Sequence, residues 1–212
     1  MKKLIVIFVA LLCVTTSCKE EPKLAYKYSD KDPMFLCSEA DMDLINEAVY
    51  AFEDFILTNY DFALNKELSS VYKNFFNNAE MGLTPMAERA DDHLIQIINA
   101  LRNEKDLWNI NEGMYSLNLD SNLLTCLANG IQDESFGRIF ETLVSSRTLR
   151  TTTIAPLMRQ QAFLLKEDKA ISTYVALDMF YAKILDIDFS QSKQEVGKII
   201  AERNSSRMGH NH

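Results

Sequence analysis

Residues 38–60 read SEADMDLINEAVYAFEDFILTNY, and this stretch decides the fold class. Its apolar residues recur every three or four positions, at Met42, Ile45, Val49, Phe52 and Ile56. That period places them on one face of an α-helix, which we expect over about residues 39–60. Ser38, followed by acidic residues in the first turn, is the predicted N-cap of this helix.

The rest of the chain continues the helical period. Similar apolar spacing predicts helices over about 65–78, 85–107, 120–130, 134–147, 152–166, 168–187 and 190–203. No two-residue alternation lasts long enough to predict a sheet, and six Gly and four Pro leave little turn chemistry for an all-β fold. We therefore predict an all-α fold, a globular array of about seven to eight antiparallel helices, with a short stack of helical hairpins as the alternative.

Composition limits the classes of protein and partner. The 212 residues are 47% hydrophobic, which suits one globular domain with a real core. Twenty-two Lys and Arg stand against 30 Asp and Glu, a formal charge of −8. That balance argues against broad phosphate binding, so we do not expect nucleic acid as a partner.

The first residues of the chain have the form of a secretion signal. Lys2 and Lys3 precede an apolar run over residues 4–14, which ends at Thr15-Thr16-Ser17-Cys18. A helix that crosses a bilayer needs about 20 apolar residues, so this run is too short to be a membrane anchor. Its length is that of the apolar region of a signal peptide.

The residues around Cys18 resemble the lipobox of bacterial lipoproteins, with Thr15 where Leu is common. The resemblance implies cleavage before Cys18 and a covalent lipid on its thiol, and we expect no other cofactor. Lys19-Glu20-Glu21 resembles the export signal that follows the lipidated cysteine in surface lipoproteins of Bacteroidota. It implies a lipid-anchored protein of the outer membrane that faces the cell surface, with a periplasm-facing protein as the alternative.

This interpretation divides the chain into four parts. Residues 1–17 are the cleaved signal peptide, and residues 18–36 are the lipidated cysteine and a flexible tether. Residues 37–204 form a single helical domain, and residues 205–212 are a disordered tail. Removal of residues 1–17 leaves 20 basic and 30 acidic residues, a net charge of −10.

Two cysteines, Cys37 and Cys126, remain after cleavage and lipidation. An exported protein can oxidise them, and a disulfide that closes a loop of this length would stabilise the fold by about 4 kcal/mol in the chain-entropy model. The alternative is two separate buried thiols that act as small apolar side chains.

His93 is the histidine on which an active or metal site would depend. Glu88 and Asp92 lie four residues apart on one face of the predicted helix, and His93 lies about 100° further round. Together these three residues are weak candidates for a metal site, because the Glu-x-x-His spacing of a di-iron helix bundle is absent. We expect a solvated helix face here.

No motif in the sequence identifies a catalytic residue. The chain has no Gly-x-Ser-x-Gly, no His-Glu-x-x-His and no phosphate-binding loop. Ser-x-x-Lys occurs at Ser70 and Ser190, but a chain with this many serines and lysines contains about one such pair by chance. We therefore assign no catalytic residue.

Charged residues are unevenly distributed along the chain. Between Pro33 and Asn65 there are no basic residues and seven acidic ones, Glu39, Asp41, Asp43, Glu47, Glu53, Asp54 and Asp61. Between Thr142 and Lys166 there are no acidic residues and four basic ones, Arg147, Arg150, Arg159 and Lys166. The two blocks either pair with each other inside the fold or present separate surfaces to partners.

The hypothesis that follows is a membrane-anchored lipoprotein whose acidic helical domain binds a protein partner in the cell envelope. Six residues are its candidate contacts, namely Asp41, Asp43, Glu47, Arg147, Arg150 and Arg159. One alternative is an immunity or inhibitor protein that neutralises a basic partner. Another is a small hydrolase or metal-dependent enzyme built around His93. A helix start at Thr151-Thr152-Thr153 is a further candidate, for holding an anion.

Overall fold

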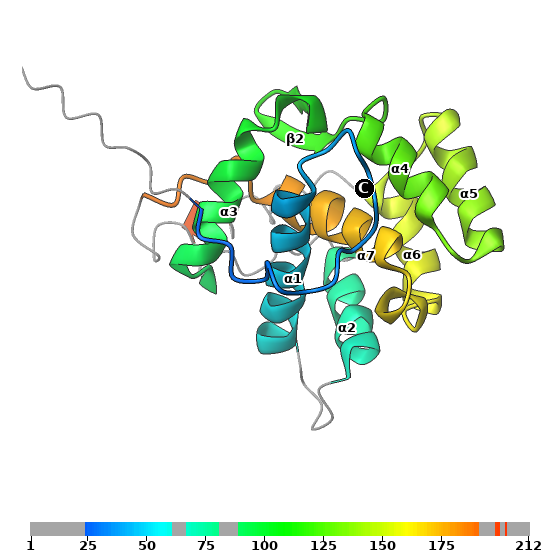
Figure 1. Cartoon of the computed structure of the whole chain (residues 1–212), viewed down its shortest axis with the longest axis horizontal. Helices are drawn as coiled ribbons and strands as arrows, with labels where there is room; N and C mark the ends of the chain where they lie inside the picture. Colours follow the sequence, from blue (N-terminus) through cyan, green and yellow to red (C-terminus); the bar gives the residue numbers. More distant parts are fainter. Residues whose placement is uncertain (1–23, 61–66, 81–88, 191–197, 200–201, 203–212) are drawn as a thin grey trace, which may run out of the picture.

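Helices dominate the computed structural model, which describes residues 24–60, 67–80, 89–190, 198–199 and 202 (Figure 1). The described residues contain seven α-helices, α1 (Met42–Asn59), α2 (Leu68–Glu80), α3 (Asp92–Asn103), α4 (Asn122–Gly130), α5 (Glu134–Ser145), α6 (Thr151–Gln160) and α7 (Lys169–Tyr174). The predicted all-α class is therefore confirmed.

Aspartates set the start of two helices later than the sequence predicts. Asp41, and not Ser38, caps α1, because its carboxylate accepts a hydrogen bond from the Leu44 amide at 3.1 Å. Asp91 caps α3 in the same way, with the Leu94 amide at 2.7 Å. α3 therefore begins at Asp92, and residues 85–88 of the helix expected over about 85–107 lie outside the described residues.

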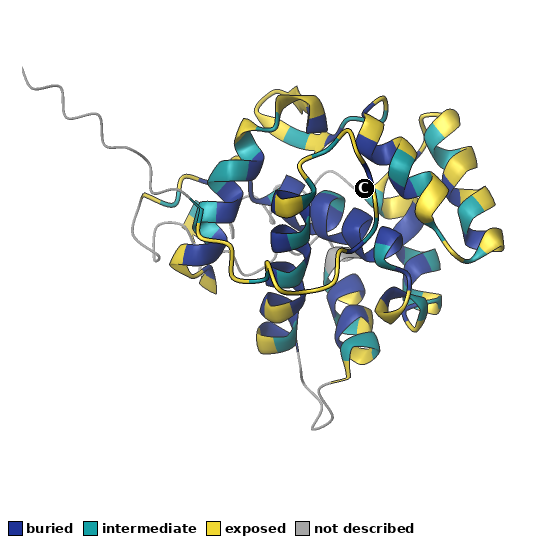
Figure 2. Ribbon diagram, viewed as in Figure 1, coloured by how far each residue is buried: buried dark blue, intermediate teal, exposed yellow. Residues whose placement is uncertain are grey.

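The segment from α7 onward forms the centre of the fold. It continues from α7 through a π-helical turn, η4 (Val175–Phe180), into a 3-10 turn, η5 (Tyr181–Lys183). Almost all of its residues are buried, and Figure 2 shows this dark segment behind α1. α1 packs on α7 and η4, α4 packs on α7, and α2 packs between α1 and α6.

Contacts between α1 and this central segment are aromatic and polar. The rings of Phe52 and Phe180 lie 5.1 Å apart, and the Tyr181 hydroxyl donates a hydrogen bond to the Ala48 carbonyl at 2.8 Å. The sequence predicts one regular helix over 168–187. The structure has helical turns over residues 169–183 only, and their hydrogen-bond pattern changes from α to π to 3-10 along the segment.

A β-hairpin replaces the irregular segment that follows α3. β1 (Trp108–Asn111) pairs antiparallel with β2 (Met114–Leu117), and Glu112 and Gly113 form the turn with φ of 51° and 81°. Two consecutive positive φ angles are typical of the two-residue turn that suits hairpins. The sequence predicts no strand here, because in each strand a single residue, Trp108 or Leu117, is buried.

Residues 24–36, which we call the strap, lie along the domain and correct the expectation of a flexible tether. Leu24, Tyr28 and Phe35 pack against the core, and Met34 is buried. Five hydrogen bonds fix the strap to α1. They are Lys27 N and Tyr28 N to Glu47, Tyr28 Oη to Asp54, Met34 N to Asn46 Oδ1, and Tyr50 Oη to the Asp32 carbonyl.

Several predicted features lie outside the described residues. They are the signal peptide over 1–17, Cys18 with Lys19, Glu20 and Glu21, the tail over 205–212, and most of the helix expected over 190–203. Within the described ranges, every helix is too short or too polar to span a bilayer.

Candidate functional site

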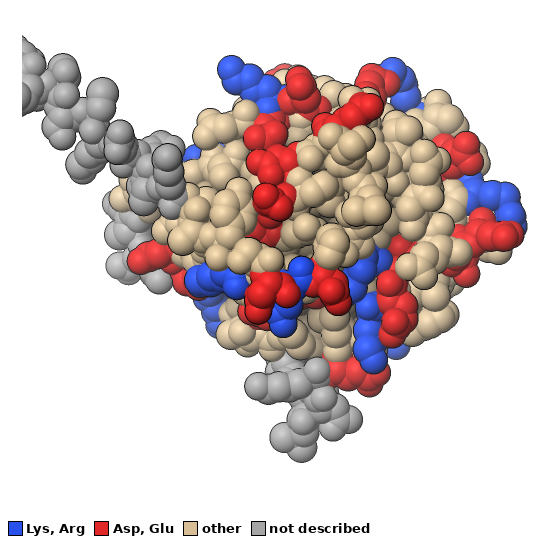
Figure 3. Space-filling view, in the orientation of Figure 1, with Lys and Arg blue, Asp and Glu red and all other residues tan. Residues whose placement is uncertain are grey.

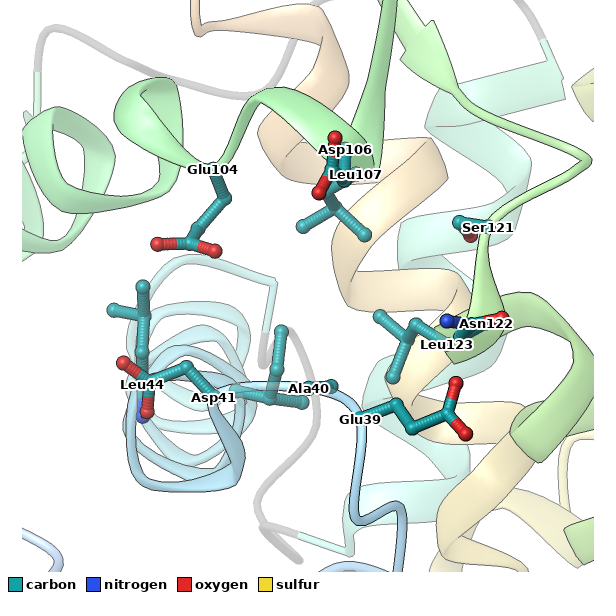
Figure 4. Close-up of a pocket in the computed structure, with 11 residues that line it drawn as sticks. Glu39, Ala40, Asp41, Leu44, Glu104, Asp106, Leu107, Ser121, Asn122 and Leu123 are labelled. Atoms are coloured by element: carbon teal, nitrogen blue, oxygen red, sulfur yellow. The ribbon is translucent and has the colours of Figure 1, made fainter.

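A pocket of about 130 Å³ lies where the start of α1, the end of α3 and the start of α4 meet (Figure 4). The 3-10 turn η2 (Lys105–Leu107) forms its far wall. Eleven residues line it, Glu39, Ala40, Asp41, Leu44, Ile45, Glu104, Asp106, Leu107, Ser121, Asn122 and Leu123. We call this the acidic pocket.

Four carboxylates surround the acidic pocket. They belong to Glu39, Asp41, Glu104 and Asp106, and no Lys or Arg is among the described residues that line it. Figure 3 shows acidic side chains gathered on this face, over the start of α1 and the end of α3. The pocket is therefore a region of negative potential in a protein that is already acidic.

Apolar side chains lie between the carboxylates. Figure 4 shows the side chains of Leu107 and Leu123 near each other, away from α1, and Leu44 and Ile45 belong to the α1 side of the pocket. All four are buried. A pocket with acidic edges and an aliphatic interior suits a group that combines a positive charge with an aliphatic chain.

Glu104 occupies an unfavourable position for a carboxylate. It caps the C-terminal end of α3, where the helix dipole disfavours negative charge. Burial raises the pKa of Glu104, and the charges of Asp41 and Asp106 raise it further. These like charges repel one another, and the described residues place no lining cation between them.

A disulfide fixes one wall of the acidic pocket. Cys37 and Cys126 are bonded, with their Cα atoms 5.7 Å apart and a sequence separation of 89. Cys37 lies two residues before Glu39, and Cys126 lies on α4 three residues after Leu123. The bond thus ties the segment that carries Glu39 to the helix that carries Leu123.

The predicted acidic contacts divide between surface and core. Asp43 is exposed, but Glu47 is 1% exposed and is not a surface contact, which corrects the prediction. The Glu47 carboxylate accepts hydrogen bonds from the amides of Lys27 and Tyr28, at 2.6 and 3.0 Å. It also lies 2.7 Å from Nε2 of His93. Glu47 therefore joins the strap, α1 and α3.

The predicted basic contacts do not form one site. Arg147 is exposed and contacts both carboxylate oxygens of Asp120, at 2.8 and 3.0 Å. Arg150 is exposed at the N-cap of α6, and Arg159 is half-buried in its last turn. The helix start proposed for an anion is close to an acid, because the Thr151 hydroxyl donates to Asp178 at 3.2 Å.

The three residues predicted as weak metal candidates, Glu88, Asp92 and His93, do not form a site in the described part of the structure. His93 is buried against Glu47, which corrects the expectation of a solvated helix face, while Asp92 is exposed. Glu88 lies outside the described residues. No group of three or more His, Cys, Asp or Glu side chains within the described ranges is arranged to hold a metal ion.

Sequence reasoning missed Glu104 and Asp106. They follow the last turn of α3, far from the acidic block of α1, and only the fold brings them beside Asp41. The sequence carries one signal, the pair of acids directly after the apolar period of α3 ends. These acids predict an exposed turn after α3, but they do not predict that the turn lies beside the start of α1.

Searches of known proteins identify no relative of this chain. No protein-family model, no curated protein sequence and no solved structure matches it.

Proposed function

We propose that this chain is a lipid-anchored envelope lipoprotein whose helical domain binds a protein partner through the acidic pocket. The observation that supports the proposal is the set of four carboxylates around one small, partly apolar pocket that no Lys or Arg of the described ranges lines. The N-terminal resemblance to lipoproteins supports the anchor at Cys18, with an outer-membrane, surface-facing location.

The chemistry of the acidic pocket favours a lysine or arginine side chain of the partner. A cation placed among Glu39, Asp41, Glu104 and Asp106 relieves their mutual repulsion, and the aliphatic stem of the same side chain contacts the leucines. An immunity or inhibitor protein that neutralises a basic partner is one form of this function. The strong acidic character of α1 and the pocket favours that form.

The test uses fluorescent pentalysine as a probe of the pocket, measured by fluorescence anisotropy at low salt. The combined variant Asp41→Asn, Glu104→Gln and Asp106→Asn removes three charges from the pocket. Asn is a good N-cap, so the change at Asp41 preserves the start of α1. We expect saturable binding to the wild type and at least a tenfold loss in the variant.

The matched control removes three exposed acids elsewhere, through Glu134→Gln, Glu141→Gln and Glu167→Gln. Both triple variants carry the same net charge, and the control is expected to bind within twofold of the wild type. An equal loss in both would show that pentalysine responds to net charge alone. That result would reject the acidic pocket as the binding site.

The proposed anchor requires a separate test in cells. Metabolic labelling with a fatty acid should label the wild-type protein and leave a Cys18→Ala variant unlabelled. External protease should digest the wild-type protein on intact cells if it faces outward. Full protection from protease would favour the periplasm-facing alternative.

A further inference from the structure

A second pocket, of about 370 Å³, lies between the strap, α1 and the start of α3. Its lining residues are Lys27, Tyr28, Ala51, Asp54, Phe55, Thr58, Asn59, Arg89, Asp91, His93 and Leu94. We call this the strap pocket. Its volume falls in the range of small-molecule sites, and it combines apolar surfaces of Phe55 and Leu94 with convergent polar groups.

Most charges of the strap pocket already have partners. The Tyr28 hydroxyl donates to Asp54 at 2.6 Å, so this carboxylate is held against the pocket wall. His93 lies against Glu47. Lys27 and Asp91 are 3.9 Å apart and both exposed, which is a weak, solvated pair.

Arg89 is the exception among these charges. Its guanidinium donates to the amide oxygen of Asn59 at 3.1 Å, and within the described part of the chain no carboxylate forms an ion pair with it. A guanidinium offers five N–H donors in a fork that matches a carboxylate. Counting only partners among the described residues, Arg89 therefore has N–H donors outside any ion pair, and it lines a cavity that Phe55 and Leu94 also line.

We propose that the strap pocket binds a small zwitterion, a free amino acid with an apolar side chain. Arg89 receives the carboxylate of the ligand, and Asp91, two residues along the chain, receives its ammonium group. Phe55, Leu94 and the ring of Tyr28 contact the apolar side chain. The aspartates that line the pocket disfavour a phosphate dianion in the same place.

The strap forms part of this site and depends on Glu47. The amides of Lys27 and Tyr28, the two strap residues that line the pocket, both donate to the Glu47 carboxylate. The same carboxylate contacts His93 of α3, which also lines the pocket. One buried group thus positions two walls of the pocket, and a bound ligand in turn stabilises the docked strap.

The test is calorimetric titration of the full chain with four probes. L-phenylalanine carries both charges, 3-phenylpropionate lacks the ammonium group, 2-phenylethylamine lacks the carboxylate, and inorganic phosphate lacks the apolar part. We expect L-phenylalanine to bind most tightly, and 2-phenylethylamine to bind at least tenfold more weakly. Absence of saturable binding by L-phenylalanine, or tighter binding of phosphate, would overturn the proposal.

Two variants locate the binding. Arg89→Gln is expected to weaken L-phenylalanine binding at least tenfold, while Arg138→Gln, an exposed arginine on α5, leaves it within twofold of the wild type. Thr58→Phe places a ring in the pocket from an exposed position of α1 and should also abolish binding. Unchanged affinity in both Arg89→Gln and Thr58→Phe would reject this pocket.

Discussion

The two pockets beside α1 differ in the charges of the residues that line them. The acidic pocket gathers four carboxylates with no Lys or Arg among the described residues of its lining, whereas the strap pocket contains charges of both signs, most of them paired. A long-range electrostatic attraction to cations follows from the first arrangement. The second offers a small number of directed hydrogen bonds inside a larger volume.

A similar contrast divides the acids of α1 itself. Asp41 stands at the open edge of the acidic pocket, while Glu47 and Glu53 are buried with partners, Glu53 at 3.5 Å from Lys169. These residues are six positions apart and look alike in the sequence. A count of acids therefore overstates the charge that α1 presents to a partner.

Loss of the disulfide should have the largest effect on stability, and it should weaken binding at the acidic pocket without weakening binding at the strap pocket. Replacing Cys37 and Cys126 by Ser is expected to lower the free energy of unfolding by about 4 kcal/mol, because the unfolded chain is no longer constrained. Urea denaturation measures this loss. Below the unfolding transition, pentalysine binding should weaken because one wall of the acidic pocket is released, and L-phenylalanine binding should persist. Equal loss at both sites would contradict this separation.

The next largest effect should be the difference in unfolding free energy between variants of a buried and of an exposed acid of α1. Glu47→Ala should lower the free energy of unfolding by about 3 kcal/mol, because it leaves two strap amides and His93 without their shared partner. Asp43→Asn, one turn earlier and exposed, should change it by less than about 0.5 kcal/mol. Urea denaturation of both variants is the measurement, and similar values would refute the structural role of Glu47.

Salt should distinguish the two modes of binding. Pentalysine binding depends on several exposed charges, so its affinity should fall about tenfold between low salt and 0.3 M NaCl as these charges are screened. L-phenylalanine binding, which depends on close contacts inside a pocket, should change less than about twofold. Titrations of both ligands at both salt concentrations test this difference. An equal fall in the two affinities would contradict it.

Replacement of Glu104 should have the smallest effect on the free energy of unfolding, and that effect should be stabilising. A carboxyl whose pKa is raised in the folded state destabilises the protein at higher pH, so stability should fall as pH rises through that pKa, above the ordinary value of 4.5. Glu104→Gln removes this dependence and should stabilise the protein at neutral pH by roughly 0.5 kcal/mol, the scale of exposed charge interactions. Thermal unfolding from pH 4 to 8 tests the sign; a destabilised variant would contradict it.

Much of the helical content was predictable, because amphipathic helices repeat apolar residues at their own period. α1, α4 and α5 begin within a few residues of their predicted starts. The hairpin was not predictable from alternation, since each of its strands buries a single residue. The strap was missed for a related reason, because polar amides rather than a periodic apolar face hold it to Glu47.

The candidate sites were less predictable than the helices. Asp41 was a candidate from the acidic block, but Glu104 and Asp106 reach the same pocket only through the packing of α3 on α1. The burial of Glu47 and His93 was hidden as well, because the acids nearest before them in sequence, Asp43 and Asp92, are exposed. The local sequence gives the positions of charged residues, but tertiary contacts determine which of them stay exposed and can bind a partner.

The central position of α7, η4 and η5 has a consequence for biosynthesis. These elements span residues 169–183, so a growing chain acquires the centre of its core only after α1 to α6 have been made. A chain stalled at residue 160 contains both cysteines and the sequences that form α1 to α6, yet it lacks the segment on which α1 and α4 pack. Oxidation of the thiols can therefore precede folding, and the last-made part of the domain completes it.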